Sequence, residues 1–342
     1  MDQVECAVCP EWTMVDIRTR DVFATMRPDL VLVQSRLEEA ARIDYPGVSD
    51  LVLGLVRAGG KRLRPLILLL AGRAYGGDQG SLVTAGAGVE LLHTASLVHD
   101  DTVDRAGMRR GRPTLNSVLP SGAVILLGDF LFAQSAMLAA ATNSPRVVSI
   151  FASTLADICD GQLREMFFAH RLDQSREEYE RRIFGKTASL FAGSAEMGAI
   201  IGSATEPAVQ ALRQYGSDVG MAFQIVDDVL DLREDASQLG KPAGHDLTQG
   251  TVTLPTIIYA SGLTQTSDAA IRLEGVVSGE IDEPSEVGKV VEEIRDSGAL
   301  EAAMDEATGF AARSKTHLAA APDPEVRDML EQVADVVCER ST

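Results

Sequence analysis

Apolar residues recur at three- and four-residue spacing in most windows of this chain. One such stretch runs from Val89 to Ser96, and another runs from Phe151 to Gln162. This spacing places apolar side chains on one face of an α-helix. Pro and Gly interrupt the pattern, for example at residues 46–47 and 120–122, and leave segments of helix length between the breaks. Alternating patterns typical of strands are scarce, so the sequence predicts an all-α fold.

We find no linker long enough to divide the chain into domains. The sequence therefore predicts one helical bundle over residues 26–342, preceded by an arm of residues 1–25 that we expect to be poorly ordered, as chain termini often are. The longest apolar stretches, such as residues 66–71, fall well short of the roughly 20 residues that a membrane span needs. No basic segment followed by an apolar run marks a signal peptide at the start. We expect a soluble, cytoplasmic protein.

Acidic residues outnumber basic ones, 50 against 31, for a formal net charge of −19. This balance argues against nucleic acid as a partner and against attachment to anionic lipid. A polyanionic substrate would have to be held by metal ions and by a few placed cations.

The cysteines Cys6 and Cys9 form a single Cys-x-x-Cys pair near the start of the chain. A zinc or redox role and a chance occurrence in a loose arm both remain open, because no second pair accompanies them.

Two Asp-Asp-x-x-Asp clusters carry the first candidate chemistry. Residues 100, 101 and 104 follow an apolar helical stretch, and their spacing places them on one helical face. One such cluster could equally be a solvated helix end. The pattern recurs at residues 227, 228 and 231, again after an apolar helical stretch, and this weakens that interpretation. Oxygen-only ligands suit Mg²⁺, which commonly binds carboxylates together with substrate phosphates.

Four basic segments accompany the two acidic clusters. Each alone would be an ordinary basic loop, but Arg and Lys side chains can bind phosphate oxygens. Gly185-Lys186-Thr187 is not a P-loop, because Glu180 occupies the position of the upstream glycine. The four segments are residues 59–65, residues 109–114, residues 185–187 and residues 240–242.

Together these segments resemble the trans-isoprenyl diphosphate synthase, or polyprenyl synthetase, family over about residues 31 to 260. The resemblance implies the all-helical isoprenoid synthase fold around a central cavity, and a homodimer. It also implies magnesium-dependent, head-to-tail condensation of an allylic diphosphate with isopentenyl diphosphate. The chain departs from the family at Gly250-Thr251, where a Gly-Lys is common.

The resemblance assigns roles to matching residues. Mg²⁺ would be held by Asp100, Asp101, Asp104, Asp227, Asp228 and Asp231. The allylic diphosphate would contact Arg109, Lys186 and Lys241, and isopentenyl diphosphate would contact Lys61, Arg64, His93 and Arg110. The reacting carbon would lie beside Thr187 and Gln224, with Asp246 near the metal site. Catalysis would rest on the first cluster together with Lys186, Thr187, Gln224, Asp227 and Asp228.

Small side chains precede the first cluster and bear on product length. In this family, bulky aromatic residues at the positions of Ala95 and Ser96 stop the growing chain, so small ones predict a medium or long product that could pass to membrane enzymes. Close helix packing would also explain small residues. Phe151 is the next candidate barrier, or an ordinary core residue. Alternatives are a short-chain farnesyl or geranylgeranyl diphosphate synthase, a class I terpene cyclase or head-to-head condensing enzyme, a non-catalytic partner subunit and a structural acidic protein.

Overall fold

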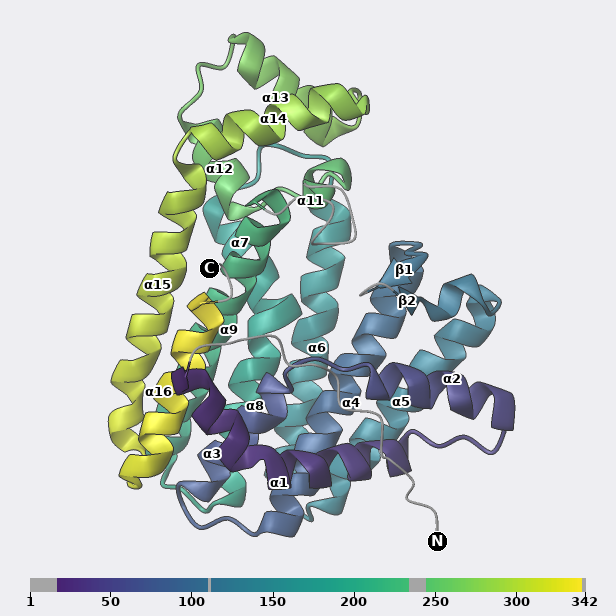
Figure 1. Cartoon of the computed structure of the whole chain (residues 1–342), viewed down its shortest axis with the longest axis vertical. Coiled ribbons are helices and arrows are strands. Elements are labelled where there is room, and N and C mark those ends of the chain that lie inside the picture. Colours follow the sequence, from purple (N-terminus) through teal and green to yellow (C-terminus); the bar gives the residue numbers. More distant parts are fainter. Residues whose placement is uncertain (1–16, 110–111, 234–243, 340–342) are drawn as a thin grey trace, which may run out of the picture.

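The computed structural model describes residues 17–109, 112–233 and 244–339, which are almost entirely helical (Figure 1). This confirms the predicted all-α fold. A short antiparallel hairpin, β1 (Met108–Arg109) and β2 (Arg112–Pro113), interrupts the helices after α4. The N-terminal half contains α1 (Ile17–Ala40), α2 (Pro46–Arg57), α3 (Leu63–Arg73), α4 (Gln79–Val103), the 3-10 turn Leu115–Ser117, α5 (Ser121–Ala141) and α6 (Pro145–Phe168).

The C-terminal half begins with α7, which runs without a break through a π-helical turn into α8. Its elements are α7 (Arg176–Ile183), the π-turn Phe184–Ala188, α8 (Ser189–Ile201), α9 (Glu206–Arg233), α11 (His245–Thr248), α12 (Leu254–Ser261), α13 (Asp268–Ser278), α14 (Pro284–Asp296), α15 (Ala299–Thr316), the 3-10 turn His317–Ala320 and α16 (Pro324–Glu339).

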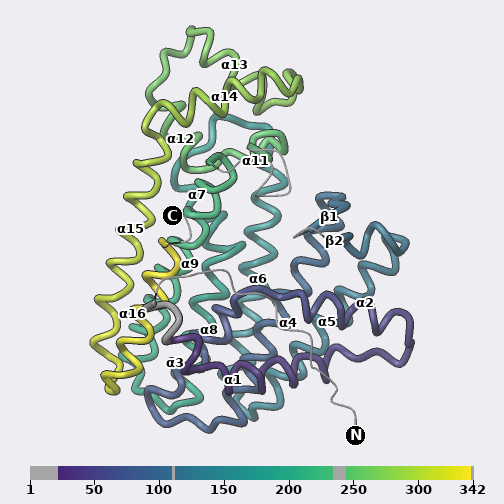
Figure 2. The backbone as a smooth tube through the Cα atoms, in the orientation of Figure 1, coloured from purple at the N-terminus to yellow at the C-terminus, as the bar shows by residue number. Residues whose placement is uncertain are grey.

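The long helices α4, α6, α8 and α9 form the centre of the molecule, with α15 along one side (Figures 1 and 2). α1 crosses one end and packs on α3 and α4, while α13 and α14 cover the other end. One apolar cluster fills the end covered by α1, and a second lies among α7, the C-terminal half of α9 and α11–α15. Phe310 packs against both clusters, so they adjoin.

α1 begins at Ile17, inside the segment expected to be a poorly ordered arm. Val22 and Met26 are buried one helical turn apart and Val33 and Leu37 continue the stripe, which explains why the helix starts early. Cys6 and Cys9 lie outside the described residues.

Two helices of the described residues, α4 and α5, are long and apolar enough by composition to span a membrane, because Gly, Ala, Ser and Thr extend their apolar runs. The sequence analysis, which counted uninterrupted apolar stretches, did not identify them. α4 is a core helix, since 78% of its apolar window is buried inside the protein. Only 33% of the α5 window is buried, so α5 presents an apolar face outward.

Candidate active site

The first aspartate cluster lies at the C-terminal end of the buried helix α4. Asp100 and Asp101 are in its last turn and Asp104 is its C-cap. Negative charge is unfavourable here, because the carbonyl ends of a helix carry partial negative charge and burial removes water. Burial raises the pKa of Asp100 to about 6, against the opposing pull of Lys186. Burial likewise raises the pKa values of Asp101 and Asp104. The cluster therefore favours a cation between its carboxylates.

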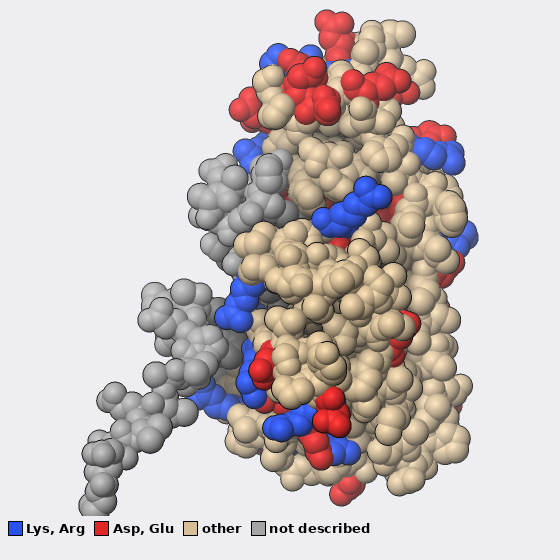
Figure 3. All heavy atoms as spheres, turned by 90° about the vertical axis from the view of Figure 1, so that its right-hand side faces the viewer, with Lys and Arg blue, Asp and Glu red and all other residues tan. Residues whose placement is uncertain are grey.

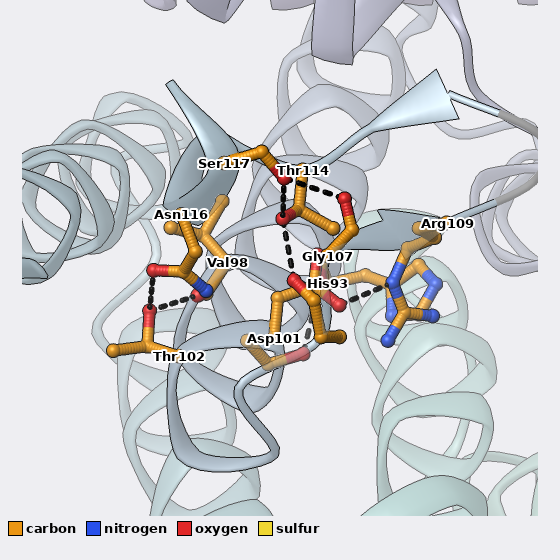
Figure 4. Close-up of polar contacts among 11 residues, drawn as sticks. His93, Val98, Asp101, Thr102, Gly107, Arg109, Thr114, Asn116 and Ser117 are labelled. Carbon is orange, nitrogen blue, oxygen red and sulfur yellow. Dashed lines mark hydrogen bonds and ion pairs between the residues drawn. The ribbon is translucent and has the colours of Figure 1, made fainter. Parts of the chain in front are cut away.

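The hairpin after α4 brings the basic residue Arg109 back to this cluster. Arg109 Nε donates to Asp101 Oδ1 over 2.7 Å (Figure 4). The hairpin is held over the helix end by Thr114, whose hydroxyl donates to the carbonyl of Ala106 over 2.6 Å. Arg109 thus lies beside the first cluster.

The second cluster lies at the corresponding end of α9, where Asp228 and Asp231 are buried. Burial raises the pKa of Asp228 to about 7, although hydrogen bonds from Gln224 and Tyr179 work in the other direction. Asp231 Oδ2 accepts from the backbone N–H of Asp246 over 3.0 Å. This bond brings the backbone of Asp246 to the second cluster.

The π-turn Phe184–Ala188 connects the two clusters. Lys186 pairs with Glu165 on α6, and its charge also acts on Asp100. The hydroxyl of the next residue, Thr187, donates to Gln224 Oε1 over 2.6 Å, next to the second cluster. Burial opposes the charge of Lys186, but Glu165 and Asp100 outweigh burial and raise its pKa. Two adjacent residues of one turn therefore act at both clusters. The charge of Lys186 acts on Asp100, and Thr187 bonds to Gln224 beside the second cluster.

Glycines allow this turn to approach α6 closely. A Cβ on Gly161 would lie 2.2 Å from the backbone nitrogen of Lys186, and a Cβ on Gly185 would lie 2.7 Å from the carbonyl oxygen of Asp157. Only glycine permits contacts this short between backbones. A π-turn adds a residue to the helix and commonly marks a functional site.

Two basic residues at the start of α3, Arg62 and Arg64, make different kinds of contact. Arg62, in the left-handed backbone region at φ 53°, donates to Glu90 on α4 over 2.5 Å and to Gln34 on α1 over 2.8 Å. These contacts are structural, and we call the Arg62–Glu90 ion pair the pin. Arg64 lies over the ring of Phe191, 4.5 Å from its centroid, and 5.8 Å from that of Phe223. Arg64 is thereby placed beside α9, at Phe223, the residue that precedes Gln224 in the sequence.

Other predicted site residues lie on or near α3, α4 and α6. His93 and Lys61 are half-buried, on α4 and just before α3. Ala95 and Phe151 are buried in the same apolar cluster, and Ser96 Oγ donates to the carbonyl of His93 over 2.9 Å. Arg110 and Lys241 lie outside the described residues.

Three contributors went unrecognised in the sequence. Glu165 carries a signal that could have identified it, since it follows Gln162 by three residues on a helix already recognised. Tyr179 and the pin partner Glu90 carry none, because each acts on a residue far away in the chain.

The carboxylates do not form a closed cage. Among the residues that the structure describes, no group of three or more His, Cys, Asp or Glu side chains is arranged to hold a metal ion. The donor set nevertheless fits a hard divalent cation, since it consists of carboxylate oxygens at two helix ends.

Comparison with known proteins identifies the family. The polyprenyl synthetase family profile matches residues 46–294 of the chain. The chain belongs to the polyprenyl synthetase family. Component 2 of the heptaprenyl diphosphate synthase of Geobacillus stearothermophilus is 36% identical over 318 residues, covering 93% of this chain and 98% of the relative. The octaprenyl diphosphate synthase of Haemophilus influenzae is 33% identical over 314 residues, covering 92% and 94%.

Solved structures of this family agree with the fold of this polyprenyl synthetase. The decaprenyl diphosphate synthase of Rhodobacter capsulatus superimposes with a TM-score of 0.88 at 35% identity, covering 95% of this chain and 99% of that one. The polyprenyl synthase of Caulobacter crescentus, complexed with calcium and isoprenyl diphosphate, gives a TM-score of 0.89 at 33% identity, covering 95% and 98%. These similarities confirm the predicted fold and the prediction of a prenyltransferase.

Protons should compete with divalent cations for the cluster carboxylates of this polyprenyl synthetase. The raised pKa values of Asp100 and Asp228 mean that the metal-free folded protein binds more protons than the unfolded chain between the usual aspartate range and about pH 7. These groups therefore cost stability as pH rises through that window, and a bound cation should restore it. We expect Mg²⁺ to raise the melting temperature more at about pH 8 than at about pH 5, measured by scanning calorimetry. Asp100→Asn should reduce this difference, and an equal response at both pH values would contradict the prediction.

Removing the pin should destabilise the enzyme. Arg62→Met leaves Glu90 buried without its cation, which should lower the free energy of unfolding by roughly 2–4 kcal/mol, measured by urea denaturation. Arg62→Met combined with Glu90→Leu should recover much of the loss, because no uncompensated charge remains. As a control, Arg57→Met removes an exposed pair with Glu38 and should be close to neutral. Equal losses in the Arg62 and Arg57 variants would contradict the role of the pin.

Proposed function

We propose that this enzyme condenses an allylic diphosphate with successive isopentenyl diphosphates, head to tail, to a medium or long all-trans polyprenyl diphosphate and pyrophosphate. The observation that carries the proposal is the π-turn, because Lys186 and Thr187 link residues of both aspartate clusters. The names of relatives, heptaprenyl and octaprenyl diphosphate synthase, support the reaction and the length of the product.

Mg²⁺ is the proposed cofactor, held by aspartates at the ends of α4 and α9. When bound, it would neutralise the diphosphate and stabilise the charge that develops as pyrophosphate leaves. The calcium and isoprenyl diphosphate in the Caulobacter crescentus structure belong to that protein, and they support a divalent ion here. The proposed ligands are those assigned from sequence.

Basic side chains would bind and orient the two substrates. Arg109, Lys186 and Lys241 would hold the allylic diphosphate, and Lys186 would exchange its partner Glu165 for the phosphate oxygens. The isopentenyl diphosphate would contact Lys61, Arg64, His93 and Arg110. The allylic C–O bond breaks with loss of pyrophosphate, the isopentenyl double bond forms the new C–C bond, and the resulting cation loses a proton to the released pyrophosphate.

An exposed apolar face on α5 and α6 supports a homodimer. Figure 3 shows a broad surface with few charges on the side of the molecule that carries these helices. Leu126 is 68% exposed and Phe167 is 76% exposed, and contiguous apolar surface of this kind marks an interface. The exposed apolar side chains of this face are Ile125, Leu126, Met137, Val148, Leu163, Met166 and Phe167.

We propose that a second copy of the chain covers this face, and that the enzyme works in the cytoplasm and passes its product to membrane enzymes. The relatives named component 2 belong to enzymes of more than one component, so a different chain is the alternative occupant.

Charging this face should separate the dimer. Leu126→Glu should shift the enzyme from dimer toward monomer in sedimentation velocity, because a carboxylate would be buried at the interface. Ile271→Glu on α13 changes an exposed apolar residue away from this face and should leave the dimer intact. A wild-type chain that sediments as a monomer at all concentrations would contradict the homodimer.

Product length should follow the size of the residue at position 95. Incubation with farnesyl diphosphate, isopentenyl diphosphate and Mg²⁺, followed by mass spectrometry of the products, should give a chain longer than geranylgeranyl diphosphate. Ala95→Phe should shorten it, because a ring would replace a methyl group five residues before the first cluster. Phe151→Ala should lengthen it if Phe151 is the next barrier.

The melting temperature of each variant checks for overpacking, which costs about 1–3 kcal/mol. A wild-type product no longer than geranylgeranyl diphosphate would favour the short-chain alternative, which a short-chain isoprenyl diphosphate synthase of Methanothermobacter thermautotrophicus, 36% identical over 290 residues, keeps open. A cyclase would consume no isopentenyl diphosphate.

A further inference from the structure

Both carboxylate oxygens of Asp228 are engaged by protein side chains. The hydroxyl of Tyr179 donates to Oδ2 over 2.8 Å, and the amide nitrogen of Gln224 donates to Oδ1 over 2.8 Å. Asp228 is only 3% exposed and Tyr179 only 1%. A carboxylate in this position is well placed to orient its donors.

A second hydrogen bond of Gln224 links Asp228 to Thr187. Because the amide nitrogen of Gln224 faces a carboxylate, its oxygen must face the other way, and there it accepts the proton of Thr187 Oγ1 over 2.6 Å. A hydroxyl has one proton and two lone pairs. With its proton committed to Gln224, Thr187 can direct lone pairs only into the remaining space, which suits a developing positive charge on an allylic carbon.

Tyr179 is itself held firmly. The guanidinium of Arg182 lies 5.4 Å from the centroid of its ring and donates to the carbonyl of Val252 over 2.7 Å. α7, which carries Tyr179, leads directly into the π-turn that carries Thr187.

We propose that Tyr179 is a positioning residue that orients Thr187 through Asp228 and Gln224. The inference rests on the proposed condensation reaction.

Two buried tyrosines provide a matched test. Tyr179→Phe and Tyr215→Phe each remove one buried hydrogen bond, since Tyr215 donates to the carbonyl of Leu330 over 2.7 Å. We expect similar falls in melting temperature. Tyr179→Phe should lower kcat about 10-fold or more, with KM for both substrates and the half-saturating Mg²⁺ concentration within about 2-fold of wild type. Tyr215→Phe should change none of these. Calorimetric titration with an unreactive allylic thiodiphosphate and Mg²⁺ gives the active fraction, so kcat is not confounded by misfolding.

The aspartates of the second cluster provide the second arm. Asp228→Asn places an amide nitrogen against Gln224 or Tyr179 and so disturbs the hydrogen bond to Thr187. It should lower kcat about 10-fold or more, as Tyr179→Phe does. Asp227→Asn should also raise the half-saturating Mg²⁺ concentration about 10-fold or more, since loss of a ligand costs at least as much as loss of a residue that supports one.

Two outcomes would overturn the inference while the reaction stands: an active wild type in which Tyr179→Phe matches Tyr215→Phe in kcat, or an Asp228→Asn variant that keeps the kcat of the wild type. A wild type that does not consume isopentenyl diphosphate would refute the proposed function itself, and the positioning role with it.

Discussion

The structure depends on keeping negative charge at the C-terminal ends of two buried helices. At the ends of α4 and α9 the helix dipole and the loss of water both oppose a carboxylate, and the pKa values of Asp100 and Asp228 rise accordingly. Negative charge in such a place is stable only if neighbouring groups compensate for it. Arg109 supplies one to the first cluster, and Lys186 acts on the same cluster from the π-turn.

The compensating groups are themselves positioned by the packing of the helices. The close approach of Gly161 and Gly185 seats the π-turn on α6, and this puts Lys186 beside Glu165. The ion pair keeps a buried ammonium satisfied in the protein alone, and phosphate oxygens can replace the carboxylate without a change of fold. The two halves of the candidate site therefore share one rigid turn rather than a mobile loop.

Similar residues in the sequence perform different tasks in the fold. Lys61, Arg62 and Arg64 read as one basic segment, yet Arg62 is turned inward to Glu90 while Arg64 lies over Phe191. Asp227 and Asp228 are adjacent, but both oxygens of Asp228 accept hydrogen bonds from buried side chains. A helix turns by about 100° per residue, so neighbours in sequence necessarily face different surroundings.

The sequence by itself determined the helical class, the two aspartate clusters and the basic residues Arg109 and Lys186, because helical periodicity and the spacing of charged residues are local properties. It also contained Glu165, one turn beyond a recognised position on α6. Only the tertiary structure decided that Arg62 is a pin, that residues 17–25 belong to a helix, and that Tyr179 bonds to Asp228. Each of these depends on which helices pack together, and a hydrogen bond between α7 and α9 leaves no trace in the spacing of residues along the chain.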